Sequence, residues 1–137
     1  MCATSHPLAA QEAIGILKQG GNALDAAIAG AVLLGICEPQ MTGIGGDCFA
    51  LVKPAGSNEV LAWNGSGTAP AAASVDDLRA RGQDRIGETA VESVTIPGAI
   101  DAFCQMSETW GRIGIDAVLQ PAIHYAEAGV PVAPRVA

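Results

Sequence analysis

The spacing of apolar and polar residues predicts two helices at the start of the chain. Over residues 7–19 apolar side chains recur every three or four positions, Pro7 suits the first turn, and the following Gly-Gly pair ends the repeat. The stripe expected to face inward consists of Ala10, Ala13, Ile14 and Leu17. Residues 23–37 follow Asn22 as N-cap, with Asp25 placed where a carboxylate favours the helix dipole. This second helix is apolar on nearly all sides, so we expect it to be covered on several faces.

The middle of the chain predicts an antiparallel pair of strands. Residues 48–52 are a short, wholly apolar run that indicates a fully buried strand, and residues 59–63 return beside it after a turn over residues 54–58. Asn64-Gly65 then marks a sharp turn at the end of the second strand. A short helix follows over residues 74–81, with its first serine as the cap.

Two further helices are predicted near the end of the chain. The first covers residues 99–110 and has one apolar side made of Ile100, Phe103, Cys104 and Trp110. The second begins at Asp116 as its cap and ends at Gly129, and its inward-facing residues are expected to be Leu119, Ala122, Ile123 and Ala126. Helices together with one antiparallel hairpin, without internal repeats or linkers, predict an α+β fold.

Composition changes this picture in one respect. Half of the 137 residues are apolar and only 15% are charged, whereas a typical soluble domain has about 25% charged residues. This balance favours a piece of a larger protein whose helices and strands pack against further chain, and the alternative is a compact, alanine-rich domain.

The net charge of −7 argues against nucleic acid and anionic membranes as partners. No apolar run reaches the length of a membrane span, and no export-type leader opens the chain. We therefore expect a cytoplasmic protein, or a periplasmic or secreted one whose leader has been removed.

Candidate titratable and metal-binding residues are sparse. The four cysteines, at positions 2, 37, 48 and 104, form no CxxC pair and are expected to be small apolar thiols. His6 and His124 lie far apart in the sequence without a carboxylate at catalytic spacing, and Glu38 with Asp47 is only a weak candidate for an acid–base pair. We predict no metal site and no cofactor.

A glycine-rich loop, Thr42-Gly43-Ile44-Gly45-Gly46-Asp47, stands between the second helix and the first strand. Nucleotide-binding loops run from a strand to a helix, so that the helix N-terminus meets the phosphate, and this loop runs the opposite way without a P-loop lysine. Phosphate binding is therefore disfavoured. The preferred interpretation is that these glycines let the strand pass beneath a packed helix.

Several motifs stand out by their order and spacing, and they are residues 6–9, 19–27, 38–50, 65–70, 96–98, 120–123 and 131–135. Together they resemble the N-terminal part of the large subunit of the γ-glutamyltransferases, which are N-terminal-nucleophile hydrolases. The resemblance implies part of an α/β/β/α sandwich, with residues 1–137 forming a single, incomplete segment of the large subunit. It also implies that the nucleophilic threonine opens the small subunit beyond residue 137, so we assign no catalytic residue to this chain.

The turn Gly65-Ser66-Gly67 is the substrate-binding candidate, because the resemblance implies that it forms one wall of the acyl pocket. Relatives typically carry an arginine here, which pairs with the α-carboxylate of a γ-glutamyl substrate, and an arginine fork is suited to a carboxylate. Alignment puts Ser66 at that place and Gly67 where an acidic residue is common. This departure resembles acylase-like and oxamate-amidohydrolase-like members. The alternative is that Ser66 is a turn residue without a ligand.

The resemblance implies a precursor that cleaves itself and then transfers or hydrolyses an acyl group through a threonine acyl-enzyme. The implied partners are a small-molecule amide or γ-glutamyl substrate, the remainder of the large subunit, and the small subunit. A second hypothesis is a non-catalytic binding or structural module that keeps the scaffold without the nucleophile.

Overall fold

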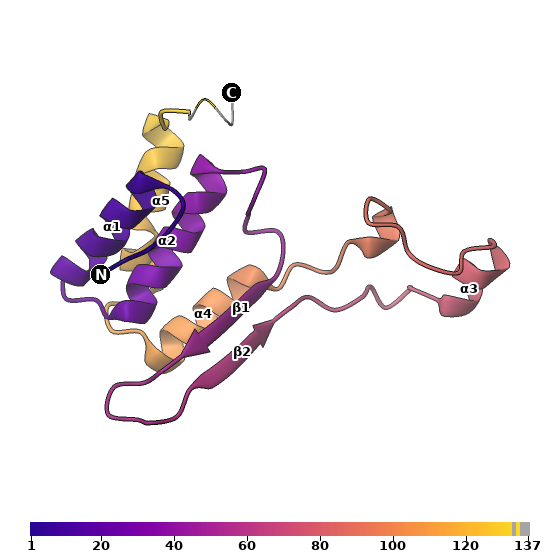
Figure 1. The fold of residues 1–137 in the computed structure, drawn as a ribbon, viewed down its shortest axis with the longest axis horizontal. Coiled ribbons are helices and arrows are strands. Elements are labelled where there is room, and N and C mark those ends of the chain that lie inside the picture. The colour runs from indigo at the N-terminus through magenta and orange to yellow at the C-terminus, as the bar shows by residue number, and fades with distance from the viewer. Residues whose placement is uncertain (133, 135–137) are drawn as a thin grey trace.

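The elements follow one another along the chain as helices, a hairpin and further helices. In a computed structural model, which describes residues 1–132 and 134, they are α1 (Pro7–Lys18), α2 (Ala23–Cys37), β1 (Cys48–Val52), β2 (Leu61–Gly65), α3 (Val75–Ala80), the 3₁₀ helix η1 (Val91–Ser93), α4 (Ala99–Trp110) and α5 (Ile115–Ala128). The strands pair antiparallel. Helix α4 lies between the hairpin and helices α2 and α5, while α1 packs on α2 (Figure 1). Ala133 and Arg135 of the last motif lie outside the described residues.

The predicted starts of α1 and α2 are confirmed, and side chains fix both. His6 precedes α1 and its Nδ1 accepts a hydrogen bond from the Leu8 amide at 3.3 Å. The Asn22 side chain accepts from the amides of Leu24 and Asp25, and the Asp25 carboxylate accepts from the Asn22 amide in return. This capping box satisfies amides that a helix start otherwise leaves without partners.

Asp25 also connects the first helices to the end of α4. Its side chain is fully buried, and one carboxylate oxygen accepts from the Arg112 amide at 3.0 Å. The Asn22 side-chain amide donates to the Trp110 carbonyl at 2.6 Å. A pair of residues predicted only to cap one helix therefore also holds the end of another.

The core consists of small and medium apolar side chains between the helices. Its buried members are Ala13, Ile16, Ala26, Ile28, Ala29, Ala102, Met106 and Val118. The predicted inward stripe of α1 was wrong at Ile14, which is 38% exposed, whereas Ile16 and Ala9 are fully buried. The physical reason is close helix approach: a Cβ placed on Gly30 of α2 would lie 3.7 Å from the Ala13 Cβ, so small residues define this interface.

The later helices also turn their inner faces differently from the prediction. On α4 the buried residues are Ala99, Ala102, Met106 and Ser107, while Ile100 is 42% exposed. On α5 Ala122 is buried as predicted, but Val118 is buried as well and Ile123 is 44% exposed. Helix α5 begins after Gly114, whose φ of 81° suits glycine, so Asp116 lies in the first turn and is not the cap.

The hairpin pairs Cys48 with Gly65 and Val52 with Leu61. The second strand begins two residues later than predicted, because the Ser57 hydroxyl accepts from the Glu59 amide and keeps that residue in the turn. One sheet face packs on the helical core through Ala50 and Trp63. The prediction of a fully buried first strand was wrong, since Phe49 and Leu51 on the other face are 69% and 78% exposed.

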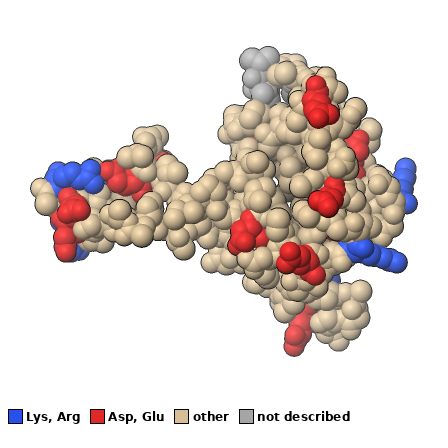
Figure 2. Space-filling model, turned by 180° about the vertical axis from the view of Figure 1, so that it is seen from behind, with Lys and Arg blue, Asp and Glu red and all other residues tan. Residues whose placement is uncertain are grey.

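Residues 66–98 form an arm that leaves the end of β2, carries α3 and η1, and returns to α4 (Figure 1). On the arm the Arg81 guanidinium pairs with Glu92 at 2.9 Å, and Arg79, Arg81 and Arg85 are exposed. In Figure 2 basic and acidic side chains lie together near the tip of the arm, further basic ones lie on the opposite side of the molecule, and other acidic ones are scattered over the body. Across residues 1–132 and 134, no helix is both long and apolar enough to cross a membrane.

Candidate functional site

Three segments meet where β2 ends, and we call this place the junction. They are residues 46–47 before β1, residues 65–68 at the end of β2 and just after it, and residues 95–99, which lead into α4. The Gly46 carbonyl accepts hydrogen bonds from the amides of Gly98 and Ala99, at 3.0 and 2.9 Å. These two amides belong to the first turn of α4, which has no side-chain cap, so the loop carbonyl satisfies them instead.

Asp47 joins the other two segments of the junction. Its Oδ1 accepts from the Gly67 amide at 2.9 Å and from the Thr95 hydroxyl at 3.2 Å. The Ile96 amide donates to the Thr68 carbonyl at 2.9 Å, which adds a backbone link between the same segments. The chain that follows β2 is therefore held by the Asp47 carboxylate and by the backbone of the segment that leads into α4.

Glycine is required in the junction because backbones approach each other closely there. A Cβ on Gly67 would lie 1.6 Å from the Ile96 carbonyl oxygen, and one on Gly98 would lie 2.5 Å from the Gly65 carbonyl oxygen. No side chain fits at either position without moving a backbone segment. An acidic side chain at position 67, where the resemblance implied one, would not fit this backbone.

The loop glycines do not confirm the steric interpretation given from sequence. A Cβ on Gly43, Gly45 or Gly46 would meet no atom within 4 Å, and none of the three has a positive φ. The close approach is instead at Gly35 of α2, where a Cβ would lie 3.4 Å from the Gly43 Cα. The loop does pass beneath the helix, but the glycine that permits this belongs to the helix.

Ser66 is exposed and lies between Gly65, the last residue of β2, and Gly67. The sharp turn predicted at Asn64-Gly65 was wrong, because both residues extend the strand. We keep the name turn for Gly65-Ser66-Gly67. Its amide donates to the Asn64 side chain at 3.0 Å, whereas its hydroxyl makes only a long bond of 3.4 Å to the neighbouring Gly67 carbonyl. The hydroxyl is thus nearly uncommitted among the described residues and can donate to or accept from a ligand. The structure brings all three predicted substrate-binding residues into one turn.

The other candidate residues named from the sequence make local structural contacts. The Glu38 carboxylate accepts from the Ser5 hydroxyl and Asp47 belongs to the junction, so these acids have separate local roles. His124 stacks edge-on against Tyr125 with ring centroids 5.2 Å apart. In the part of the chain that the structure describes, no three His, Cys, Asp or Glu side chains gather at metal-binding distance.

All four cysteines are free thiols, and Cys37 is the buried one. Burial raises the pKa of the Cys37 thiol, and the charge of Glu38 raises it further. Burial likewise raises the pKa of Cys48. Both thiols are therefore protonated at neutral pH, which makes them poor nucleophiles and poor metal ligands.

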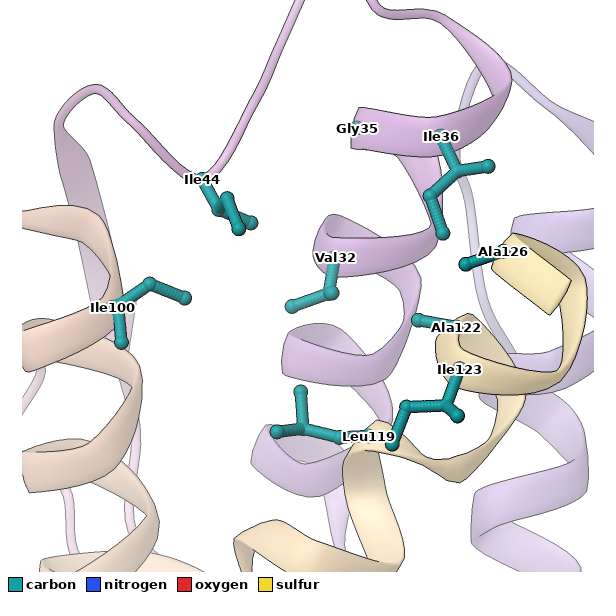
Figure 3. Close-up of a pocket in the computed structure, with 9 residues that line it drawn as sticks. All are labelled: Val32, Gly35, Ile36, Ile44, Ile100, Leu119, Ala122, Ile123 and Ala126. Atoms are coloured by element: carbon teal, nitrogen blue, oxygen red, sulfur yellow. The ribbon is translucent and has the colours of Figure 1, made fainter.

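An apolar groove of about 380 Å³ opens between α2, α4 and α5 (Figure 3). Its lining side chains point toward a common space from three helices and from the loop before β1. They are Val32, Gly35, Ile36, Ile44, Ile100, Leu119, Ala122, Ile123 and Ala126. None of these residues can donate or accept a proton through its side chain, so the groove carries no catalytic chemistry of its own.

Sequence reasoning missed Asp47 and Thr95 as partners of the substrate-binding turn. The signal was present only as two separate motifs, the glycine-rich loop ending in Asp47 and the Thr95-Ile96-Pro97-Gly98 segment. Their meeting depends on the path of the arm, which leaves β2 and returns over thirty residues later. Local periodicity does not predict such a long-range contact.

Comparison with known proteins shows which family and which solved structures this chain resembles. The sequence profile described as gamma-glutamyltranspeptidase matches residues 9–137. The glutathione hydrolase-like YwrD proenzyme of Bacillus subtilis (strain 168) is 37% identical over 133 residues, which are 96% of this chain and 25% of that protein. The acylase ACY 1 proenzyme of Pseudomonas sp. (strain V22) is 36% identical over 143 residues, covering 98% of this chain and 25% of that protein. The solved structure of the cephalosporin acylase from Bacillus halodurans is 46% identical and superposes with a TM-score of 0.90, over 98% of this chain and 25% of that chain.

The predicted fold class is confirmed. The helices packed on an antiparallel hairpin superpose on this acylase structure and form part of an N-terminal-nucleophile hydrolase fold. The chain belongs to the gamma-glutamyltranspeptidase family and corresponds to its N-terminal part. It spans about a quarter of the length of the curated relatives described above.

Proposed function

We propose that this chain is one segment of the large subunit of a self-processing enzyme that transfers or hydrolyses the acyl group of a small-molecule amide. Membership of the gamma-glutamyltranspeptidase family supports the proposal, as do relatives named as proenzymes. In the complete protein a threonine outside residues 1–137 opens the small subunit after self-cleavage. Its freed α-amino group takes the proton of its own hydroxyl, which attacks the amide carbonyl.

The contribution of this chain to that reaction is binding. The turn Gly65-Ser66-Gly67 forms one wall of the acyl pocket, and the junction fixes its position. The acyl-enzyme formed on the threonine is then released by water or by an acceptor amine. No group of residues 1–137 exchanges a proton in these steps.

The observation that carries the substrate proposal is Ser66, exposed and nearly uncommitted at the place of the arginine. A guanidinium forms two charge-assisted bonds with a carboxylate, each contributing about 1.5–3 kcal/mol. Since about 1.4 kcal/mol corresponds to tenfold in affinity, a γ-glutamyl group binds at least tenfold more weakly without them. We infer that the preferred acyl group is not γ-glutamyl, in keeping with an acylase among the relatives.

The uncovered apolar surfaces support a large subunit that continues beyond this segment. The outer face of the hairpin presents Phe49 and Leu51, and the groove between α2, α4 and α5 is equally open. Apolar surface of this kind is usually covered by further protein. The remaining large-subunit chain and the small subunit are the proposed partners for these faces.

The intact mass of the product of the native gene tests self-processing. We expect two fragments from one gene, with a threonine at the start of the second. A single unprocessed product without amide hydrolysis would contradict the proposal and favour the non-catalytic module.

The substitution Ser66→Arg tests the acyl preference in the complete protein. We expect the KM for γ-glutamyl-p-nitroanilide to fall about tenfold, because the new guanidinium pairs with the α-carboxylate. The matched control is Asn58→Arg, which adds the same charge in the exposed turn at the other end of the hairpin. An equal response to both variants would mean that position 66 does not face the substrate.

A further inference from the structure

The turn that forms the substrate-binding candidate has few contacts of its own. The Ser66 hydroxyl reaches only the Gly67 carbonyl, at 3.4 Å, and the Ser66 amide donates to the nearby Asn64 side chain at 3.0 Å. A flexible turn holds a ligand poorly, since its ordering must then be supplied by the binding energy. Something outside the turn therefore has to fix it.

Asp47 is the side chain placed to do so. Its Oδ1 accepts a hydrogen bond of 2.9 Å from the Gly67 amide, which belongs to the peptide bond between Ser66 and Gly67. The same oxygen accepts from the Thr95 hydroxyl at 3.2 Å, which ties the turn to the segment returning to α4. The neighbouring Gly46 carbonyl caps α4, so the backbone that carries Asp47 is itself anchored.

We propose that Asp47 is a positioning residue that sets the affinity for the acyl group by fixing the turn Gly65-Ser66-Gly67. The inference rests on the proposed function, in which this turn lines the acyl pocket. Asp47 acts through the Gly67 amide and does not touch the substrate. Thr95 holds the carboxylate in the orientation that reaches this amide.

The test uses the complete, processed enzyme and p-nitroanilides of γ-glutamate, glutarate and butyrate as acyl donors. For the donor that the wild type cleaves best, Asp47→Ala raises KM about tenfold, the loss expected for one charge-assisted hydrogen bond. The kcat changes less than about twofold, and the KM for an acceptor amine such as glycylglycine stays the same, because the turn contacts only the acyl group. Asp47→Asn keeps an oxygen acceptor of the same shape and restores most of the affinity.

Two further variants separate positioning from general stability. Thr95→Val removes one hydroxyl from the carboxylate and raises KM by about threefold, in the direction of Asp47→Ala. Glu108→Ala removes an exposed carboxylate on α4 and leaves the kinetics unchanged. Hydrogen exchange, followed by mass spectrometry over residues 64–70, becomes faster in Asp47→Ala and remains at the wild-type rate in Asp47→Asn.

The outcomes are distinct. An active wild type whose KM is unchanged by Asp47→Ala overturns this inference and leaves the proposed function standing. Equal losses in kcat and in both KM values mean a structural role only, and also overturn it. A wild type that neither processes itself nor cleaves any donor overturns the proposed function and the inference together.

Discussion

The helical body of α1, α2, α4 and α5 and the arm of residues 66–98 are held by different kinds of contact. The body buries side chains such as Ile16, Leu33 and Met106 almost completely, and a buried carboxylate joins the ends of two of its helices. The arm buries no residue at all between its two ends, and Val75, Val91 and Val94 on it are more than half exposed. At its base the arm is fixed by the hydrogen bonds of the junction, which join it to Gly46 and Asp47.

This difference shows which part of the molecule gets its shape from its own residues. Burial of apolar side chains gives the body most of its free energy of folding. Hydrogen bonds of the junction fix geometry but contribute only about 0.5–1.5 kcal/mol each. The body is therefore the stable scaffold, and the turn proposed to bind substrate stands at the boundary between it and a weakly anchored arm.

The largest expected effect concerns the body. Asp25→Ala removes the fully buried carboxylate that accepts from the amides of Asn22 and Arg112. We expect the free energy of unfolding, measured by urea denaturation, to fall by about 3 kcal/mol, because two amides lose a charged partner. Asp116→Ala, an exposed carboxylate in the first turn of α5, should cost about 0.5 kcal/mol through the helix dipole alone. Similar losses in the two variants would contradict the assignment of Asp25 as a link between helices.

A smaller effect, confined to the arm, is expected for Gly67→Ala. The new methyl group would lie 1.6 Å from the Ile96 carbonyl oxygen, so the two segments must separate, at a cost of about 1–3 kcal/mol. Because the body does not depend on this contact, we expect faster trypsin cleavage after the arginines of the arm with little change in the melting temperature. Gly46→Ala is the matched control, since its methyl group meets nothing within 4 Å. Equal cleavage rates for these two variants would mean that the contact between Gly67 and Ile96 does not fix the arm.

The smallest expected effect concerns the ion pair near the tip of the arm. A backbone hydrogen bond, and then the Arg81 guanidinium, lower the pKa of Glu92 below its ordinary value of 4.5. A carboxylate with a lowered pKa stabilises the folded arm above its unfolded pKa, and this contribution is lost as the pH falls through the folded value. An NMR titration of Glu92 in Arg81→Gln should show the pKa rising only part of the way to 4.5, since the backbone bond remains. A full return would mean that Arg81 is the sole cause.

Local pattern was sufficient to predict where the helices lie. Asn22 and Asp25 form the capping box that their three-residue spacing suggests, and Gly129 follows the last residue of α5. Such signals act between neighbours in the sequence, which is why they can be recognised without a structure.

The faces of the helices and the partners of the turn could not be predicted in the same way. Ile14 and Ile16 are equally apolar, and which of them is buried depends on the face of α1 that α2 contacts, where Gly30 lies close to Ala13. Phe49 and Leu51 look like core residues, yet the described chain provides helices for one face of the hairpin only. Likewise, the contact between Asp47 and Gly67 joins residues twenty positions apart through the geometry of the whole junction.

The way the turn is anchored has a consequence for how the substrate range of such an enzyme changes over time. The Asp47 carboxylate and close backbone contacts hold the turn, while the side chain at position 66 contributes one long hydrogen bond to it. Replacing that side chain therefore changes the chemistry presented to a ligand at almost no cost in folding stability. Under the proposed function, a single codon change at position 66 would exchange one acyl preference for another without rebuilding the scaffold beneath it.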